Sequence, residues 1–383
     1  MTSALPYGSF TTAEEPSTRR VGVAVGDGVL DLTAAARRRL PAHAQLFAGG
    51  TLDPLLAAGP DVWAEVRAGV AAEVAAGPDL LPFSDVRLHL PFRVADYVDF
   101  FASEHHARNV AEIARGDRDL PPNWKHLPAG YHSRAGTVGV SGTPVVRPRG
   151  QRRRSSGEVV FGPSARLDLE AEIGYVVGAA SRRGAPVPLR AFPEHVFGVV
   201  LLNDWSARDL QTWESSPLGP FLGKSFATSI SPWVVPLAAL GSARIAPPPR
   251  DVPLLAYLDD AGAPPWGLDV TLEVRLNGHV LSRPRAAELY WTGAQQLAHL
   301  TSAGACVGTG DLYGSGTASG PQPDQLGSLL ELAWGGRRPV VLPDRSERRW
   351  LEDGDEVVVA GSAPGPDGSR LDLGEVSALI LPA

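Results

Sequence analysis

Apolar residues occur in short runs separated by glycine and proline, a pattern typical of β-strands joined by turns. The clearest run, residues 196–202, predicts a buried strand. The chain then becomes polar at Asp204, continues through Arg208 and Gln211, and reaches Lys224 after a Pro/Gly-rich turn. A carboxylate at the end of a buried strand, followed closely by donors, suggests a binding site. An ordinary strand end before a capped helix is the alternative.

A second strand is predicted over residues 166–177, where apolar and acidic residues alternate. Glu170 and Glu172 are two residues apart and therefore share one face. On an outer face they are two solvated acids. On an inner face, two carboxylates about 7 Å apart repel and need a cation between them. The apolar run that follows favours the inner face.

A helix is predicted from Ser103, which can cap it, to about Arg115. Its apolar positions place His106 inward and His105 outward. An inward histidine is either a core residue with a satisfied partner or a candidate base. Glu331 lies in an apolar stretch, 327–334, that reads as a strand, so it needs a partner such as a histidine.

Local patterns predict the other elements, and the hairpin signal at residues 270–281 is strong. Residues 21–32 and 270–281 read as hairpins, and residues 61–74 and 286–300 as helices, the first capped by Asp61. Residues 122–134 read as a long loop, of a length that is often functional. The glycine-dense stretch 310–320 lacks the ending of a phosphate-binding loop, so no nucleotide site is expected there.

Length and charge narrow the class of protein. A chain of 383 residues suggests two folding units, which we place at 1–90 and 91–383. A net charge of −7 and a pI near 5.7 argue against nucleic acid or an anionic membrane as partners. The basic run 147–154 is read as a solvated loop. Only two lysines occur, Lys125 and Lys224, so a lysine is a less common surface residue here than usual.

The single cysteine, Cys306, excludes an intrachain disulfide and is compatible with a reducing cytosol. Residues 1–6 lack the basic segment and apolar core of a signal peptide. No apolar run approaches the roughly 20 residues that a membrane span requires. We therefore expect a cytoplasmic protein.

The candidate chemistry lies in the second unit. Its carboxylates suit a hard cation such as Mg²⁺ or Ca²⁺ better than zinc; they are Asp99, Glu170, Glu172 and Asp204. A possible His106–Glu331 pair and several donors accompany them; these donors are Arg208, Gln211, Lys224 and Thr317. A metal, a base with an orienting acid and cationic donors together fit hydrolysis through an enolate or oxyanion.

Residues 91–383 resemble the fumarylacetoacetate hydrolase family, and residues 1–90 match it more weakly. The motifs that carry the resemblance are Asp-Tyr-Val-Asp-Phe at 96–100, Pro-Asn-Trp-Lys-His-Leu-Pro at 122–128, Leu-Asp-Leu-Glu-Ala-Glu at 167–172, Asn-Asp-Trp-Ser-Ala-Arg-Asp at 203–209, Gly-Pro-Phe-Leu-Gly-Lys-Ser-Phe at 219–226 and Gly-Ser-Gly-Thr-Ala-Ser-Gly-Pro at 314–321. The resemblance implies a mostly β fold with some α, in which a small N-terminal SH3-like barrel precedes a C-terminal mixed β-sandwich roll. It also implies a homodimer.

The resemblance further implies a reaction: metal-dependent hydrolysis of the C–C bond of a 1,3-diketone acid, fumarylacetoacetate, to fumarate and acetoacetate in tyrosine and phenylalanine catabolism. It assigns the cation, Mg²⁺ or Ca²⁺ with Mn²⁺ as a third candidate, to Asp99, Glu170, Glu172 and Asp204, with Lys224 and Thr228 beside it. His106 becomes the base that activates water, oriented by Glu331. The oxyanion donors become Arg208, Gln211 and Lys224, and the substrate contacts become Arg115, Tyr131, Gln211 and Thr317.

Two positions depart from the family pattern, since Phe101 and Ser215 stand where substrate-contacting tyrosines are expected. The chemistry is therefore better supported than the substrate. The main alternative is the same fold acting on another β-keto acid, as an acylpyruvate hydrolase, a decarboxylase or a hydratase/isomerase. A binding or structural protein without activity is the remaining alternative, at the cost of burying carboxylates without purpose.

Overall fold

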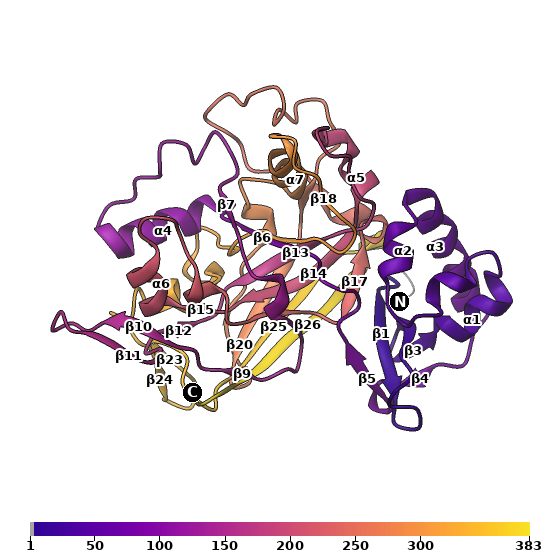
Figure 1. The fold of residues 1–383 in the computed structure, drawn as a ribbon, viewed down its shortest axis with the longest axis horizontal. Helices are drawn as coiled ribbons and strands as arrows, with labels where there is room; N and C mark the ends of the chain where they lie inside the picture. Colours follow the sequence, from indigo (N-terminus) through magenta and orange to yellow (C-terminus); the bar gives the residue numbers. More distant parts are fainter. Residues whose placement is uncertain (1–3) are drawn as a thin grey trace.

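The computed structural model describes residues 4–383, which fold into a β-rich body with helices at its periphery (Figure 1). The expected mostly β fold with some α is confirmed. Residues 1–3, the start of the segment for which no signal peptide is expected, lie outside this range. Within it, every helix is too short or too polar to cross a membrane.

Thirteen of the described strands form one large mixed sheet. The N-terminal strands, at the right of Figure 1, are β1 (Tyr7–Thr12), β2 (Arg20–Val25), β3 (Gly28–Asp31), β4 (Leu81–Pro82) and β5 (Val86–His89). The others are β6 (Tyr97–Phe100), β7 (Gly130–His132), β8 (Val138–Val140), β13 (Ala171–Val177), β14 (Val196–Asp204), β16 (Thr228–Ile230), β17 (Trp233–Pro236) and β22 (Leu312–Gly314). Since β1 pairs with β17, the strands of residues 1–90 continue the sheet of the larger unit. The SH3-like barrel stays a prediction.

A second, five-stranded sheet packs against the first and makes the sandwich. Its strands are β9 (Val145–Val146), β20 (Thr271–Leu276), β21 (His279–Ser282), β25 (Glu356–Pro364) and β26 (Arg370–Leu381). Two-stranded pairs complete the β-structure: β10 (Arg149–Arg153) with β11 (Val159–Pro163), β12 (Leu167–Asp168) with β15 (Ser206–Ala207), β18 (Arg244–Ile245) with β19 (Gly267–Leu268), and β23 (Val340–Val341) with β24 (Glu347–Arg348).

Strand β14 is buried on both faces, which explains its unbroken apolar run. Val199 and Leu201 belong to the core between the two sheets. Val200 and Leu202 belong to a second core, which the helices of the N-terminal unit cover. Because side chains alternate along a strand, one face of β14 packs into the first core and the other face packs into the second.

The helices are α1 (Leu32–Arg39), α2 (Asp53–Ala57), α3 (Pro60–Ala75), α4 (Glu104–Arg115), α5 (Phe192–His195), α6 (Arg208–Glu214), α7 (Gly293–Thr301) and α8 (Leu329–Leu332). The predictions for α4 are confirmed, because the Ser103 hydroxyl accepts a hydrogen bond from the amide of His106 at the start of the helix. The hairpin of β20 and β21 is also confirmed, with Asn277 and Gly278 at positive φ in its turn.

Four local predictions were wrong. Asp61 does not cap α3, because the helix already begins at Pro60, where the missing N–H costs nothing. The helix predicted over 286–300 begins only at Gly293, because Thr292 and Gln295 form a capping box there. Residues 327–334 contain a short helix and not a strand, since Ser328 caps α8. The basic run 147–154 is mostly strand β10, which finds a partner in β11.

Candidate metal and catalytic site

Four buried carboxylates meet near the ends of neighbouring strands inside the large sheet. Each offers an oxygen within 4.8 Å of the others; they are Asp99, Glu170, Glu172 and Asp204. The expectation that Glu170 and Glu172 face inward is confirmed, as both are almost fully buried. Asp99 comes from β6, Glu172 from β13 and Asp204 from the end of β14. Glu170 lies just before β13. Three neighbouring strands and this residue thus hold four acidic side chains in a space that suits one cation.

Gly314 makes room for this cluster. It lies on β22, between β13 on one side and β6 on the other, and pairs directly with Asp99. A Cβ atom at this position would lie 2.6 Å from Oε2 of Glu172 and 2.8 Å from Oδ1 of Asp99. Absence of a side chain on β22 therefore lets carboxylates from its two neighbouring strands approach each other.

Lys224 is the cation within the cluster. Its Nζ lies 2.5 Å from Oε2 of Glu170 and also bonds to Asp204. Thr228 and Tyr131 contact Asp204 through their hydroxyls, at 3.4 Å and 3.2 Å. The structure thus brings together all six residues predicted beside the metal, and Tyr131 with them.

One lysine does not neutralise four carboxylates. Burial raises the pKa of Asp99 and Glu172 well above the usual range, and the neighbouring carboxylates raise both further. Burial also opposes the ionisation of Glu170, but Lys224 and Arg208 outweigh it and hold that pKa below its usual value. Buried oxygens of Asp99 (Oδ1) and Glu172 (Oε1) have no hydrogen-bond partner among the described residues. Excess negative charge and unpaired acceptors are what a bound divalent cation satisfies.

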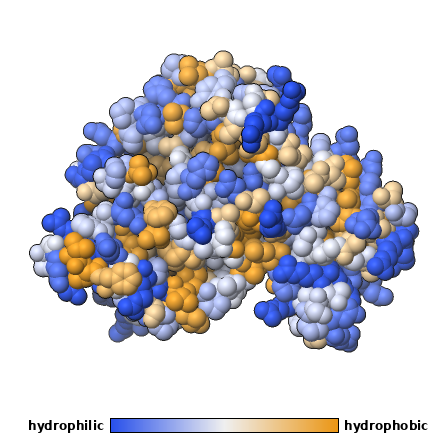
Figure 2. Space-filling view, viewed as in Figure 1, coloured by the Kyte–Doolittle hydropathy of each residue, from blue (hydrophilic) through white to orange (hydrophobic). Residues whose placement is uncertain are grey.

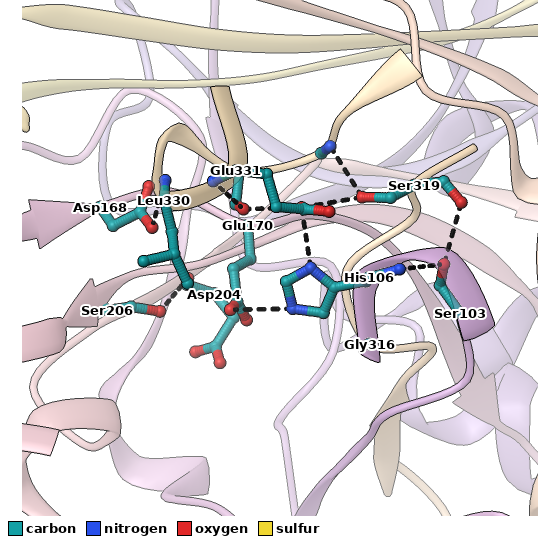
Figure 3. Close-up of polar contacts among 12 residues, drawn as sticks. Ser103, His106, Asp168, Glu170, Asp204, Ser206, Gly316, Ser319, Leu330 and Glu331 are labelled. Carbon is teal, nitrogen blue, oxygen red and sulfur yellow. Dashed lines mark hydrogen bonds and ion pairs between the residues drawn. The ribbon is translucent and has the colours of Figure 1, made fainter. Parts of the chain in front are cut away.

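His106 lies between the cluster and a second buried acid (Figure 3). Its Nδ1 is 2.7 Å from Oε2 of Glu331, and its Nε2 is 3.9 Å from Oε1 of Glu170. Burial opposes ionisation of Glu331, but His106 and the hydrogen bonds from Asn109 and Ser328 together outweigh it and lower the pKa of this carboxyl. The expected His106–Glu331 contact is confirmed, and it directs Nε2 toward the metal cluster.

Arg208 and Gln211 lie on the other side of Glu170. An Arg208 Nη atom donates to Oε1 of Glu170 at 2.6 Å, and its Nε donates to Asp168 at 2.8 Å. The other Nη lies 3.4 Å from Oε1 of Gln211, one helical turn along α6. Two cationic side chains, Arg208 and Lys224, thus flank the same carboxylate.

Some of the residues predicted to contact substrate lie near the carboxylate cluster, and others do not. Phe101 packs against His106, with ring centroids 5.3 Å apart. Thr317 is buried, and its hydroxyl lacks a partner among the described residues. The Ser215 hydroxyl donates to the carbonyl oxygen of Gln211. Arg115 lies about 13 Å along α4 from His106 and bonds to Asp117, so the structure does not bring it to the cluster.

Sequence reasoning missed several residues that hold Glu331. Its carboxylate accepts hydrogen bonds from Asn109, Ser319 and Ser328 at 2.8–2.9 Å. Asn109 follows His106 by three residues on α4, so helical spacing could have indicated it. Ser328 precedes Glu331 by three residues, which is the spacing of a helix cap. Ser319 had no local signal.

Two family models match the sequence along nearly the whole chain. A model described as fumarylacetoacetate (FAA) hydrolase C-terminal matches residues 97–375, and one described as fumarylacetoacetase N-terminal matches residues 3–91. The chain therefore belongs to the fumarylacetoacetate hydrolase family.

Several relatives that match nearly the whole chain are named fumarylacetoacetase. The chain is 42% identical to the fumarylacetoacetase of Bos taurus over 404 residues, covering 99% of this chain and 95% of that one. It is 43% identical to the fumarylacetoacetase of Caenorhabditis elegans, covering 99% and 96%. Among solved structures, a fumarylacetoacetate hydrolase from Exiguobacterium antarcticum aligns with a TM-score of 0.58 and 17% identity, covering 99% and 100%, which supports the fold alone.

Proposed function

We propose that this protein is a metal-dependent hydrolase that cleaves a C–C bond of fumarylacetoacetate to give fumarate and acetoacetate. The observation that carries the proposal is the position of His106, paired with Glu331 and directed at a cluster of four buried carboxylates. Relatives named fumarylacetoacetase, similar along the whole chain, support the choice of substrate.

The proposed cofactor is Mg²⁺ or Ca²⁺, with Mn²⁺ as a third candidate. Its ligands are Asp99, Glu170, Glu172 and Asp204, with Lys224 and Thr228 beside it. An all-oxygen donor set and unpaired buried oxygens on Asp99 and Glu172 fit such an ion. When bound, the ion supplies Lewis acidity that polarises the oxygens of the 1,3-diketone.

His106 is the proposed general base. The Glu331 carboxylate, 2.7 Å from Nδ1, is proposed to keep the imidazole proton on that nitrogen, which leaves Nε2 to take a proton from the attacking water. The water oxygen bonds to a substrate carbonyl carbon, and negative charge develops on the carbonyl oxygen. Three further hydrogen bonds fix the Glu331 carboxylate, and this keeps the imidazole in one orientation.

Carbon leaves poorly unless its charge is delocalised and neutralised. The bond between the attacked carbon and the central carbon of the diketone breaks, and its electron pair enters an enolate. Lys224, Arg208 and Gln211 are proposed to stabilise the oxyanion and the enolate, since they lie together around Glu170 and Asp204. The proton held by His106 then returns to the leaving carbon.

Substrate contacts are proposed from Tyr131, Gln211 and Thr317, which lie at or beside the cluster or in the buried segment after β22. Arg115 reaches the substrate only if α4 or its neighbours shift, because it now pairs with Asp117. Phe101 and Ser215 line the same region without phenol hydroxyls. This difference keeps a related substrate, such as an acylpyruvate, as the second candidate.

Product analysis tests the proposal. Purified protein with Mg²⁺ is incubated with fumarylacetoacetate or with an acylpyruvate, and the products are identified by NMR. Fumarate and acetoacetate in equal amounts, formed faster than any product from the acylpyruvate, support the proposal. Turnover of the acylpyruvate alone moves the function to the second candidate.

We also propose that the chain forms a homodimer in the cytoplasm, with residues 1–90 as a structural unit. Large apolar side chains support the dimer because they are exposed on neighbouring elements: Phe161 on β11, and Leu218 and Phe221 between α6 and Lys224. Apolar atoms gather over the β10–β11 hairpin at the left of Figure 2. Light scattering after chromatography tests the dimer, and a monomer at micromolar concentration contradicts it.

A further inference from the structure

Asp168 is a buried carboxylate that lies beside the cluster but has no part in it. It is the last residue of β12, its exposed fraction is 0%, and it precedes Glu170 by two residues. Its two oxygens accept hydrogen bonds from Arg208 Nε at 2.8 Å and from the backbone amides of Leu329 and Leu330 at 2.8 and 3.0 Å. The amide of the next residue, Leu169, also donates to it, at 2.8 Å. Figure 3 draws it beside Leu330 and on the far side of Glu331 from His106.

Three of these donors belong to two parts of the proposed machinery: Arg208 and the amides of Leu329 and Leu330. Leu329 and Leu330 are the first residues of α8, and the next residue is Glu331. At a helix start these amides have no partner within the helix, so a carboxylate that accepts both fixes the first turn. The third donor is the Arg208 guanidinium, which continues to Glu170. The Asp168 carboxylate therefore binds both the start of α8, the helix that carries Glu331, and Arg208, the proposed oxyanion donor.

We propose that Asp168 is a positioning residue that couples the His106–Glu331 pair to Arg208, so that base and oxyanion donor keep a fixed separation. The inference rests on the function proposed above. In hydrolysis, the nitrogen that activates water and the oxyanion donor must both act on the same substrate carbonyl group. A misplacement of either group by about 1 Å can lower the rate by about 100-fold. A carboxylate with several fixed donors in a dry interior holds such a distance well.

The variant Asp168→Asn tests this proposal. Asparagine has nearly the same size, but it has one acceptor oxygen and two donors, so it cannot accept from Arg208 and both amides. We expect kcat to fall by about 100-fold, while KM and the Mg²⁺ affinity measured by calorimetry change less than about threefold. The Mg²⁺ affinity should persist because Asp168 is not one of the four clustered carboxylates.

Asp355→Asn is the matched control. Asp355 is also buried, and it also accepts from an arginine, Arg348, and from a backbone amide, that of Glu352. Asp355 is not among the proposed metal ligands, oxyanion donors or substrate contacts, and it does not bind the His106–Glu331 pair. Both variants should lower the melting temperature, but Asp355→Asn should keep the kcat of the folded enzyme.

Hydrogen exchange measured by mass spectrometry tests the positioning role of Asp168 without depending on which substrate the enzyme cleaves. Asp168→Asn should speed up exchange both in peptides covering 326–334 and in those covering 203–214, and Asp355→Asn in neither. If wild-type protein does not cleave fumarylacetoacetate, the proposed function fails, while the exchange result still decides the coupling.

Two results overturn the proposal: wild-type kcat in Asp168→Asn, or faster exchange in only one of the two segments. If the asparagine variant does not fold, Asp168→Glu replaces it. That variant keeps the charge and moves the carboxylate by one methylene. A fall in kcat with KM nearly unchanged then supports positioning, and unchanged kcat refutes it.

Discussion

The Nδ1 atom of His106 lies 2.7 Å from Oε2 of Glu331, and neither side chain is more than 3% exposed. The two residues are more than 220 positions apart, so the fold alone makes this pair. Asn109 and Ser328 bind the same carboxylate from the two helices that carry the pair. A histidine held in this way has one ring nitrogen committed and the other directed at the carboxylate cluster.

Replacement of this histidine should separate catalysis from metal binding. His106→Ala should lower turnover by about 10²- to 10⁴-fold, the range expected for a lost general base. The affinity for Mg²⁺, measured by calorimetry, should stay nearly unchanged because the four carboxylates remain. A large loss of metal binding in this variant would instead make His106 a ligand.

Gly314→Ala should damage the metal site without unfolding the sheet. The added methyl group must displace the carboxylates of Glu172 and Asp99, because it would lie within 2.8 Å of both. We expect Mg²⁺ affinity to fall by at least about 10-fold. Gly136→Ala is the control, since nothing lies within 4 Å of a Cβ atom there. Equal Mg²⁺ affinity in the two variants would show that the four carboxylates are not the metal site.

Metal binding should depend on pH with a defined sign. Because the pKa values of Asp99 and Glu172 are raised, these two groups hold more protons in the folded, metal-free protein than in the unfolded chain. Their contribution to stability should therefore fall as pH rises from about 4 through the raised values. Mg²⁺ binds the ionised carboxylates, so it should release protons and raise the melting temperature more at about pH 8 than at about pH 5.

Glu172→Gln is the control for this titration. It should weaken Mg²⁺ binding, release fewer protons and lose most of the metal-dependent rise in melting temperature. In chelator it should be at least as stable as the wild type, because it no longer buries an ionisable group. A wild-type response to Mg²⁺ in this variant would show that Glu172 does not reach the ion.

Phe101→Tyr should test what the missing phenol does. The Phe101 ring packs edge-on against His106, so a hydroxyl there would point into the region of the base. If fumarylacetoacetate is the substrate, one added hydrogen bond should lower KM by about 3- to 10-fold with little change in kcat. Phe161→Tyr, at a site 70% exposed on β11, should change neither. A higher KM in Phe101→Tyr would indicate a substrate that needs an apolar wall.

The sequence was informative where local periodicity determines the answer. Alternation placed Glu170 and Glu172 on one inner face, and helical spacing turned His106 inward; the structure confirms both. The stretch 327–334 was misread because four apolar residues surround Glu331, and short apolar runs do not distinguish strand from helix. The Ser328-x-x-Glu331 spacing was the available signal for a helix.

Asp168 shows the limit of such reasoning. It continues the alternation of Glu170 and Glu172, so its inward face was predictable. Its partners were not, because Arg208 and Leu329 lie 40 and 161 residues away along the chain. Contacts of that range depend on how the sheets and helices pack, which periodicity does not specify. The meeting of Asp99 with Glu172 across Gly314 has the same origin.

We propose that four buried carboxylates hold a cation that hydrolysis of fumarylacetoacetate requires. The most direct measurement is the steady-state rate of this hydrolysis after chelation, as Mg²⁺ is titrated back into the stripped protein. We expect negligible turnover in chelator, and recovery that saturates at the Mg²⁺ concentration at which calorimetry shows the site to be filled. Undiminished turnover by protein shown to be free of divalent cations would contradict it.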